Sequence, residues 1–250
     1  MGKLLKYELR KTWMLKLIVL GMTAAAEILF LAGLWTQQER ALGLGVLLLS
    51  LLAMGSIMVI GLYSLVVLHR DMNTKQSYML FMTPNSTYKI LGAKVLENGL
   101  STLLGGAVFF GLGTLDITLL FAREGRLKEL WDMIMQMMRA MDERLVMSVP
   151  SLGSFFLLAL SSWFAFVTLT YLADVISSAL LNGKKGNGLV TFLLIIVLNV
   201  LVNWVVQILM DAMSPASVVS VFLAGAGIQL VFAVAMYVLT AWIMDRYLSV

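Results

Sequence analysis

Residue types on which much protein chemistry depends are nearly absent from this 250-residue chain, which has no cysteine and a single histidine. Without cysteine the chain can form no disulfide, reactive thiolate or cysteine-ligated metal site. The motifs G-x-x-x-x-G-K-[ST] and H-E-x-x-H are missing, and His69 lies at an expected membrane exit, where no Ser–His pair is indicated. We therefore predict that the chain is not an enzyme and holds no cofactor or metal of its own.

Charge is also scarce, because only 13% of the residues are charged while 60% are hydrophobic, and the mean hydropathy is +0.93. A soluble domain has about 25% charged and roughly 45–50% apolar residues. The polar residues are too few to cover a water-soluble globule of this size, so lipid must be the solvent for much of the chain. The net charge of +4 is then no argument for a nucleic-acid partner.

Apolar stretches long enough for membrane helices recur along the chain. A spanning helix needs about 20 residues, because the hydrocarbon core is roughly 30 Å thick and a helix rises about 1.5 Å per residue. This predicts an all-α polytopic membrane protein, a single transmembrane domain over residues 1–250. Its expected spans are 17–35, 41–68, 95–121, 150–173, 189–210 and 215–244.

Basic residues predict the orientation of these spans. If the N-terminus is cytoplasmic, twelve of the 18 Lys and Arg residues lie on the cytoplasmic side. The positive-inside rule therefore favours two cytoplasmic termini. Those twelve residues are Lys3, Lys6, Arg10, Lys11, Lys16, Arg70, Lys75, Lys89, Lys94, Lys184, Lys185 and Arg246.

Three segments between or before the spans have their own patterns. Residues 1–14 place leucines and Trp13 near one helical face and basic residues elsewhere, as in a helix lying on an anionic membrane surface. Residues 69–94 form the longest cytoplasmic connection. Residues 124–147 place apolar side chains at helical spacing, which predicts an amphipathic helix on the outer side.

A few polar residues interrupt the apolar spans. Glu27 lies near the middle of the first span, where a charge costs about 2.5–3.5 kcal/mol, so it is expected to be protonated, paired or in contact with water. Asn199, Asn203 and Gln207 form one stripe on the fifth span. Both sets serve either a transport pathway or polar contacts between helices, and for the stripe we favour the helix contact.

Two further carboxylates and several glycines complete the polar and small residues of the spans. Glu97 and Asp116 lie near span ends and are expected to reach the membrane interface. Small residues let helices approach closely in lipid, which predicts packing roles for the glycines. Those glycines are Gly105, Gly106, Gly111, Gly113, Gly225 and Gly227.

The connection 69–94 has an ordered set of charged, apolar and turn-forming residues. They are Asp71, Lys75, Tyr78, Met79, Leu80, Thr83, Pro84, Lys89, Gly92 and Lys94. This order resembles the coupling loop of type-2 ABC export permeases, in which an acidic residue is followed by Thr or Lys, by Leu, by Thr/Ser-Pro, by a basic residue and by Gly-x-Lys at the next helix. The start departs from the family's Glu-Arg-Glu-x-Gly-Thr, because it reads His69-Arg70-Asp71-Met72-Asn73-Thr74.

The resemblance implies a permease subunit that forms half of an export pathway in a bacterial cytoplasmic membrane. Two copies of a separate ATP-binding subunit would hold ATP and Mg²⁺, and a second permease half, identical or related, would complete the pathway. The chain is similar to exporters of phenol-soluble modulins and peptide antibiotics, which implies an amphipathic peptide or another hydrophobic compound as substrate. The implied ATPase-coupling residues are Arg70, Asp71, Lys75, Tyr78, Met79, Leu80, Phe81 and Pro84, with Asp174, Lys184 and Lys185 in a second coupling loop.

Two other functions remain open at the level of the sequence. A stand-alone secondary transporter or channel would use Glu27 and the polar stripe of the fifth span to carry an ion or proton. A membrane adaptor or immunity protein would need none of these polar residues.

Overall fold

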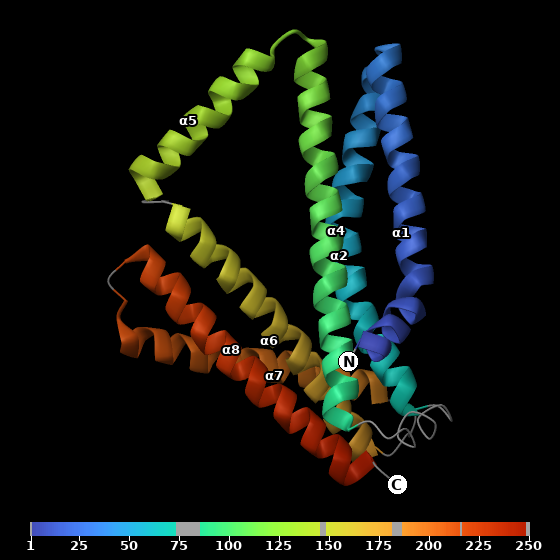
Figure 1. Cartoon of the computed structure of the whole chain (residues 1–250), viewed down its shortest axis with the longest axis vertical. Coiled ribbons are helices and arrows are strands. Elements are labelled where there is room, and N and C mark those ends of the chain that lie inside the picture. Colours follow the sequence, from blue (N-terminus) through green and yellow to red (C-terminus); the bar gives the residue numbers. More distant parts are fainter. Residues whose placement is uncertain (1, 74–85, 146–148, 182–186, 216, 249–250) are drawn as a thin grey trace. The chain divides into compact units, whose positions relative to one another are not determined.

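The chain is helical along nearly all of the residues that the computed structural model describes, which are 2–73, 86–145, 149–181, 187–215 and 217–248. Within these ranges there is no strand, so the predicted all-α fold class is confirmed (Figure 1). The elements are α1 (Gly2–Thr36), α2 (Glu39–Asn73), α4 (Thr87–Arg123), α5 (Leu127–Leu145), α6 (Val149–Leu181), α7 (Asn187–Met213), α8 (Val218–Ile243) and the short π-helix η1 (Met244–Leu248).

Six of these helices, all except α5 and η1, are long and apolar enough to cross a membrane, which confirms the six expected spans. The shortest, α8, has 26 residues and the longest, α4, has 37. About 20 residues suffice to cross the hydrocarbon core, so the helices extend beyond it. The protein is therefore a multi-pass membrane protein.

Helix α1 joins two segments that the sequence analysis treats separately. The expected interfacial helix, residues 1–14, and the first expected span, 17–35, lie in one uninterrupted helix, Gly2–Thr36. Lys16 separates the two segments in sequence, but a single charged residue does not end a helix. Glu8 and Thr12 are buried, so this amphipathic segment contacts protein with part of its surface.

Two compact units divide the chain. The N-terminal unit comprises Gly2–Ser64 with Leu96–Met138, and the C-terminal unit comprises Leu65–Val95 with Arg139–Val250. Helices α2, α4 and α5 contribute residues to both units, because a unit boundary falls inside each of them.

In the N-terminal unit, α1 and α2 form an antiparallel hairpin. The chain reverses at Gln37, which has a positive φ of 60°. The hairpin closes tightly because Gly45 of α2 lies against the backbone of Phe30, and Gly33 of α1 lies against Ala41 and Leu42.

These two glycines are not among those for which the sequence predicted packing roles. Of the predicted set, only two have a neighbour where a Cβ would stand, and in both the neighbour is a side-chain methyl group. Gly105 faces Ile60 at 3.4 Å and Gly225 faces Leu158 at 3.0 Å. No described atom lies within 4 Å of such a Cβ at Gly106, Gly111, Gly113 and Gly227.

Helix α5 confirms the predicted amphipathic helix within 124–147. Gly125, with φ +68°, makes the turn after α4. Arg126 then donates hydrogen bonds to Glu124 at 2.9 Å and to Glu129 at 2.7 Å. Its guanidinium lowers the pKa of the Glu129 carboxyl, chiefly through the hydrogen bonds that it donates to this carboxyl. The acidic side chain in the first turn also complements the positive end of the helix dipole.

The core of the C-terminal unit lies where α6 packs against α8, beside the end of α2 and the start of α4. Tyr171 and Val175 of α6 meet Leu68, Leu91 and Met244 in one buried cluster. A second cluster, around Leu169, Leu172 and Met236, packs α6 and α8 against apolar residues of α7. Burial of these side chains fixes the helix ends that carry the polar contacts described next.

Candidate functional site

A buried ion pair joins the two helix ends that flank the expected coupling loop. Asp71 lies in the last turn of α2, and Lys94 lies near the start of α4. Lys94 Nζ donates to Asp71 Oδ2 at 2.6 Å, and the two side chains are 2% and 4% exposed. A charge that is buried this deeply requires an oppositely charged partner, so the pair holds the end of α2 against the start of α4.

A second polar contact fastens the end of α2 to α6 and α7. His69 Nδ1 and Asp174 Oδ1 are 2.7 Å apart, and the hydroxyl of Thr191 donates to the same oxygen at 3.2 Å. Asp174 is fully buried, so this carboxyl group is a junction between three helices.

The start of α4 is fastened in turn to the C-terminal end of α8 and to η1. The hydroxyl of Thr87 donates to Asp245 of η1, and the hydroxyl of Tyr237 donates to the carbonyl of Tyr88 at 2.5 Å. We call these contacts, with the pairs Asp71–Lys94 and His69–Asp174, the helix-end network. Residues 74–85, which the structure does not describe, are thus connected on both sides to one packed set of helix ends.

The predicted coupling residues divide into three groups. Arg70 is exposed at the end of α2. Asp71 and Asp174 are buried in the helix-end network and contact this chain's own helices. The others lie outside the described residues, namely Lys75, Tyr78, Met79, Leu80, Phe81, Pro84, Lys184 and Lys185.

In the N-terminal unit, the structure brings Glu27 of α1 together with Asp116 of α4. The two carboxyl groups interact directly. Glu27 Oε2 and Asp116 Oδ1 are buried, and neither has a hydrogen-bond partner among the described residues. Two adjacent carboxyl groups cannot both ionise cheaply away from water, so the pair requires a proton or a bound cation.

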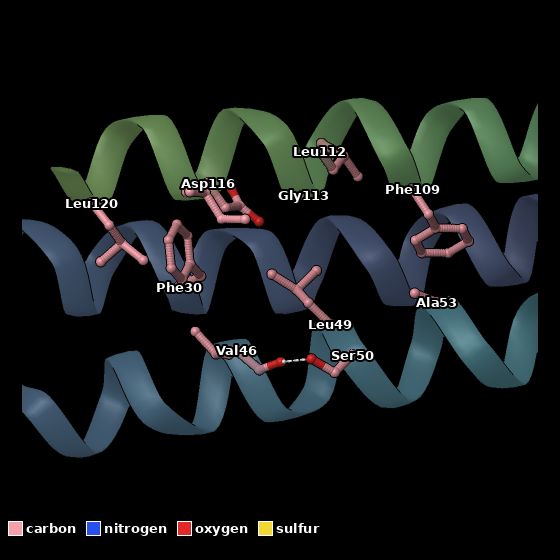
Figure 2. A pocket seen from close by; sticks show the side chains of 11 residues that line it. Phe30, Val46, Leu49, Ser50, Ala53, Phe109, Leu112, Gly113, Asp116 and Leu120 are labelled. Carbon is pink, nitrogen blue, oxygen red and sulfur yellow. Dashed lines mark hydrogen bonds between the residues drawn. The ribbon is translucent and has the colours of Figure 1, made fainter. Parts of the chain in front are cut away.

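Asp116 also lines a cavity of about 250 Å³ between α1, α2 and α4 (Figure 2). Its side chain projects from α4 toward α1, beside Phe30. The rest of the lining is apolar except for Ser50, whose hydroxyl donates to the carbonyl of Val46 at 2.8 Å. The lining residues are Phe30, Val46, Leu49, Ser50, Ala53, Phe109, Leu112, Gly113, Asp116, Ile117 and Leu120.

Another polar cluster joins α1 to α4 in the same unit. Glu97 Oε1 accepts hydrogen bonds from Lys16 at 2.6 Å, from Thr12 at 2.7 Å and from Ser101 at 2.9 Å. Glu97 and Asp116 were both expected to reach the membrane interface. That prediction is wrong, because both are buried among helices. Their burial requires internal partners, which Glu97 finds on α1.

We expect Glu97→Gln to lower the free energy of unfolding of the protein in detergent by about 1.5 kcal/mol. The amide oxygen can still accept from Thr12 and Ser101, but the charge-assisted bond from Lys16 is weakened. Thermal unfolding against the exposed control Glu39→Gln measures the difference. Equal stability of the two variants would show that the Lys16 bond contributes nothing.

The polar stripe of α7 makes a bond within its own helix. The amide of Asn203 donates to Asn199 Oδ1 at 2.9 Å and to the Asn199 carbonyl at 2.8 Å, while Gln207 is exposed. Among the described residues none of these three side chains hydrogen-bonds to another helix, and their interhelical role stays a prediction.

Sequence reasoning missed the partners of these polar groups. It considered Glu27 and Asp116 separately and did not pair them, and it did not identify Lys94 as the counter-ion of Asp71. The partners lie 89 and 23 residues away in sequence, so no local spacing connects them. The available signal was an intramembrane carboxylate on each of two spans, each needing compensation.

The comparisons with known proteins supply no relative for this site: no family model, no curated protein and no solved structure matches the chain. Among the described residues there is also no group of three or more side chains able to hold a metal ion.

Proposed function

We propose that this protein is the membrane-spanning permease subunit of an ATP-driven exporter of the type-2 ABC class, coupled to a separate ATPase. The observation that carries the proposal is the helix-end network. It joins both sides of residues 74–85 to the packed ends of α6, α7 and α8.

A connection held in this way can transmit force. If a partner pushes on residues 74–85, the flanking turns cannot yield independently, because Asp71–Lys94 locks them to one another. His69–Asp174 then passes the displacement to α6. Packed helices move as rigid bodies, so a push at the loop becomes a movement of the spans.

The proposal assigns different roles to the predicted coupling residues. We assign Arg70, whose side chain is exposed at the end of α2, to the contact with the partner surface. The coupling residues between 74 and 85 are assigned to the same contact by the resemblance alone, because they lie outside the described part of the chain. Asp71 and Asp174 act by positioning, because their side chains are buried in this chain. Two ATPase subunits with ATP and Mg²⁺ and a second permease half would complete the exporter in a bacterial cytoplasmic membrane, with both termini of this chain cytoplasmic. The substrate would be an amphipathic peptide or another hydrophobic compound.

The test is co-purification of the tagged full chain with an ATPase from its native membrane in mild detergent. We expect an ATPase to be captured with the wild-type chain, and at least tenfold less with Tyr78→Ala/Leu80→Ala. Lys128→Ala, which removes an exposed charge from α5, should leave capture unchanged. A well-expressed wild-type chain that captures no ATPase contradicts the proposal.

A stand-alone ion- or proton-coupled transporter is the second candidate, and the carboxyl pair Glu27–Asp116 favours it. It predicts transport by the purified chain in vesicles without any nucleotide, and loss of that transport in Glu27→Gln. Transport that requires both ATP and a captured ATPase contradicts this candidate and supports the first.

A further inference from the structure

The cavity of the N-terminal unit combines apolar walls with one acidic side chain that has an oxygen without a hydrogen-bond partner among the described residues. Asp116 is 9% exposed, lines the cavity and keeps Oδ1 without a hydrogen-bond partner among the described residues. A buried polar atom in a native protein normally has a partner. A ligand that donates a hydrogen bond to this oxygen would supply it.

No basic side chain is available in the sequence around the pair to neutralise it. On α1 and the turn that follows, no Lys or Arg occurs between Lys16 and Arg40, and on α2 none occurs between Arg40 and Arg70. On α4 the nearest basic residue to Asp116 is Arg123, seven residues or about 10 Å along the helix. The two carboxyl groups therefore have no basic counter-ion on these helices near the level at which they lie.

The shape and lining of the cavity select the kind of cation. An inorganic ion such as Ca²⁺ or Mg²⁺ needs about six oxygen ligands, whereas this cavity offers carboxyl oxygens of one residue and a hydroxyl group. An ammonium ion needs only a few acceptors, and the remainder of an amphipathic amine is apolar. Phe30 and Phe109 add aromatic rings to the lining, which attract a cation near their faces.

We propose that the cavity between α1, α2 and α4 binds the primary ammonium group of an amphipathic amine, with Asp116 as its ion-pairing residue and the apolar walls around its hydrocarbon body. Glu27 lies beside Asp116 and adds to the negative potential at this end of the site. A cavity of about 250 Å³ is slightly smaller than the roughly 300–1,000 Å³ of drug-sized sites, so it accommodates a small aryl or alkyl amine.

A free amine fits this cavity better than the ammonium of a lipid headgroup. In a phosphatidylethanolamine headgroup, a phosphate follows the ammonium within a few bonds and would lie against apolar walls that offer it no donor. The proposal concerns binding to this chain alone and does not depend on an ATPase partner.

The experiment is equilibrium binding of 2-phenylethylammonium to the full chain in phosphatidylcholine nanodiscs, with empty nanodiscs subtracted to remove partition into lipid. The neutral analogue 2-phenylethanol is the matched probe. We expect saturable binding of the amine with one site per chain, and at least tenfold weaker binding of the alcohol. Equal binding of the two probes, or no saturable binding of the amine, overturns the proposal.

Substitutions test where in the protein the amine binds. Asp116→Asn should weaken amine binding at least tenfold, and Asp116→Asn/Glu27→Gln should abolish it. Asp211→Asn, an exposed carboxylate of α7, is the control and should bind as the wild type does. Wild-type affinity in Asp116→Asn overturns the proposal.

A steric variant guards against misfolding of the charge variants. A Cβ at Gly113 would meet no atom within 4 Å, so Gly113→Leu narrows the cavity while both carboxyl groups stay in the chain. This variant should reduce amine binding at least tenfold, and unchanged binding contradicts the site.

Phosphatidylethanolamine added to the nanodiscs distinguishes a free amine from a lipid headgroup as the ligand. Unchanged affinity for the amine supports a free amine. Stoichiometric competition by the lipid overturns the proposal of a free amine in favour of the lipid headgroup.

Discussion

Lys94→Met is expected to lower the free energy of unfolding by about 3–5 kcal/mol, the cost of removing one partner from a buried ion pair. Lys94 and Asp71 are almost completely buried, and their charged atoms are 2.6 Å apart. Without the ammonium group, the Asp71 carboxylate would have to bind a proton or draw in water, and either change would loosen the end of α2 from the start of α4. Thermal unfolding of the purified protein in mild detergent measures the loss.

Two comparisons make this prediction specific. Lys89→Met removes an exposed ammonium from the same helix and should change stability by at most about 0.5 kcal/mol. Asp71→Leu/Lys94→Met removes both charges and should recover much of the loss, because a buried pair replaced by apolar groups is often neutral. If Lys94→Met is as stable as Lys89→Met, the pair does not hold the helix ends together.

The same variants separate structure from coupling. If the helix-end network transmits force, the apolar pair in Asp71→Leu/Lys94→Met keeps the two helix ends packed and should keep capture of the proposed ATPase. Lys94→Met alone should reduce that capture together with stability. A stable double variant that captures no ATPase would instead place Asp71 or Lys94 in the partner contact itself.

The fold was predictable because membrane insertion depends on the apolar content of consecutive residues. The uncharged stretch 41–68 and the stretch 189–210 predict spans without any knowledge of their neighbours, and α2 and α7 contain them. In lipid the backbone must satisfy its own hydrogen bonds, so a long apolar stretch has one local solution, the helix. The helix ends were less predictable, because Gly2–Thr36 continues through Lys16 without a break.

The site was only half predictable, because a polar residue in a span requires a partner but does not identify it. Glu27 was recognised from the cost of its charge, yet its neighbour Asp116 was assigned to the membrane interface. Glu97 was assigned there too, although Lys16 and Thr12 meet it between helices. Tertiary packing decides which helices are adjacent and which residues meet along their length. The spacing of residues within one helix carries no information about this.

The glycines also show that the sequence does not identify where two helices come close together. Repeated small residues predicted close packing on α4 and α8, but among the glycines whose surroundings the structure describes the tightest approaches are at Gly33 and Gly45 in the α1–α2 hairpin. A glycine is needed where another backbone passes, and the sequence does not say where that occurs.

Gly45→Ala is therefore expected to destabilise the protein by about 1–3 kcal/mol, the usual cost of overpacking. The added Cβ would stand 2.6 Å from Phe30 Cα and 2.8 Å from Phe30 Cβ, closer than real Cβ contacts allow. Backbone atoms cannot rotate away, so α1 and α2 must separate. Gly33→Ala repeats the clash at Ala41 and Leu42, and the double variant should lose more than either single one.

Gly43→Ala supplies the matched control, two residues away on the same helix. Its Cβ would meet no atom within 4 Å, and alanine is the better helix former by about 1 kcal/mol, so this variant should be as stable as the wild type or more stable. Opposite signs for Gly45→Ala and Gly43→Ala in thermal unfolding would establish the close crossing of α1 and α2. Because Phe30 also lines the cavity, Gly45→Ala should weaken amine binding as well, whereas Gly43→Ala should not. Equal stability of the two variants would mean that the hairpin is packed less closely than the structure has it.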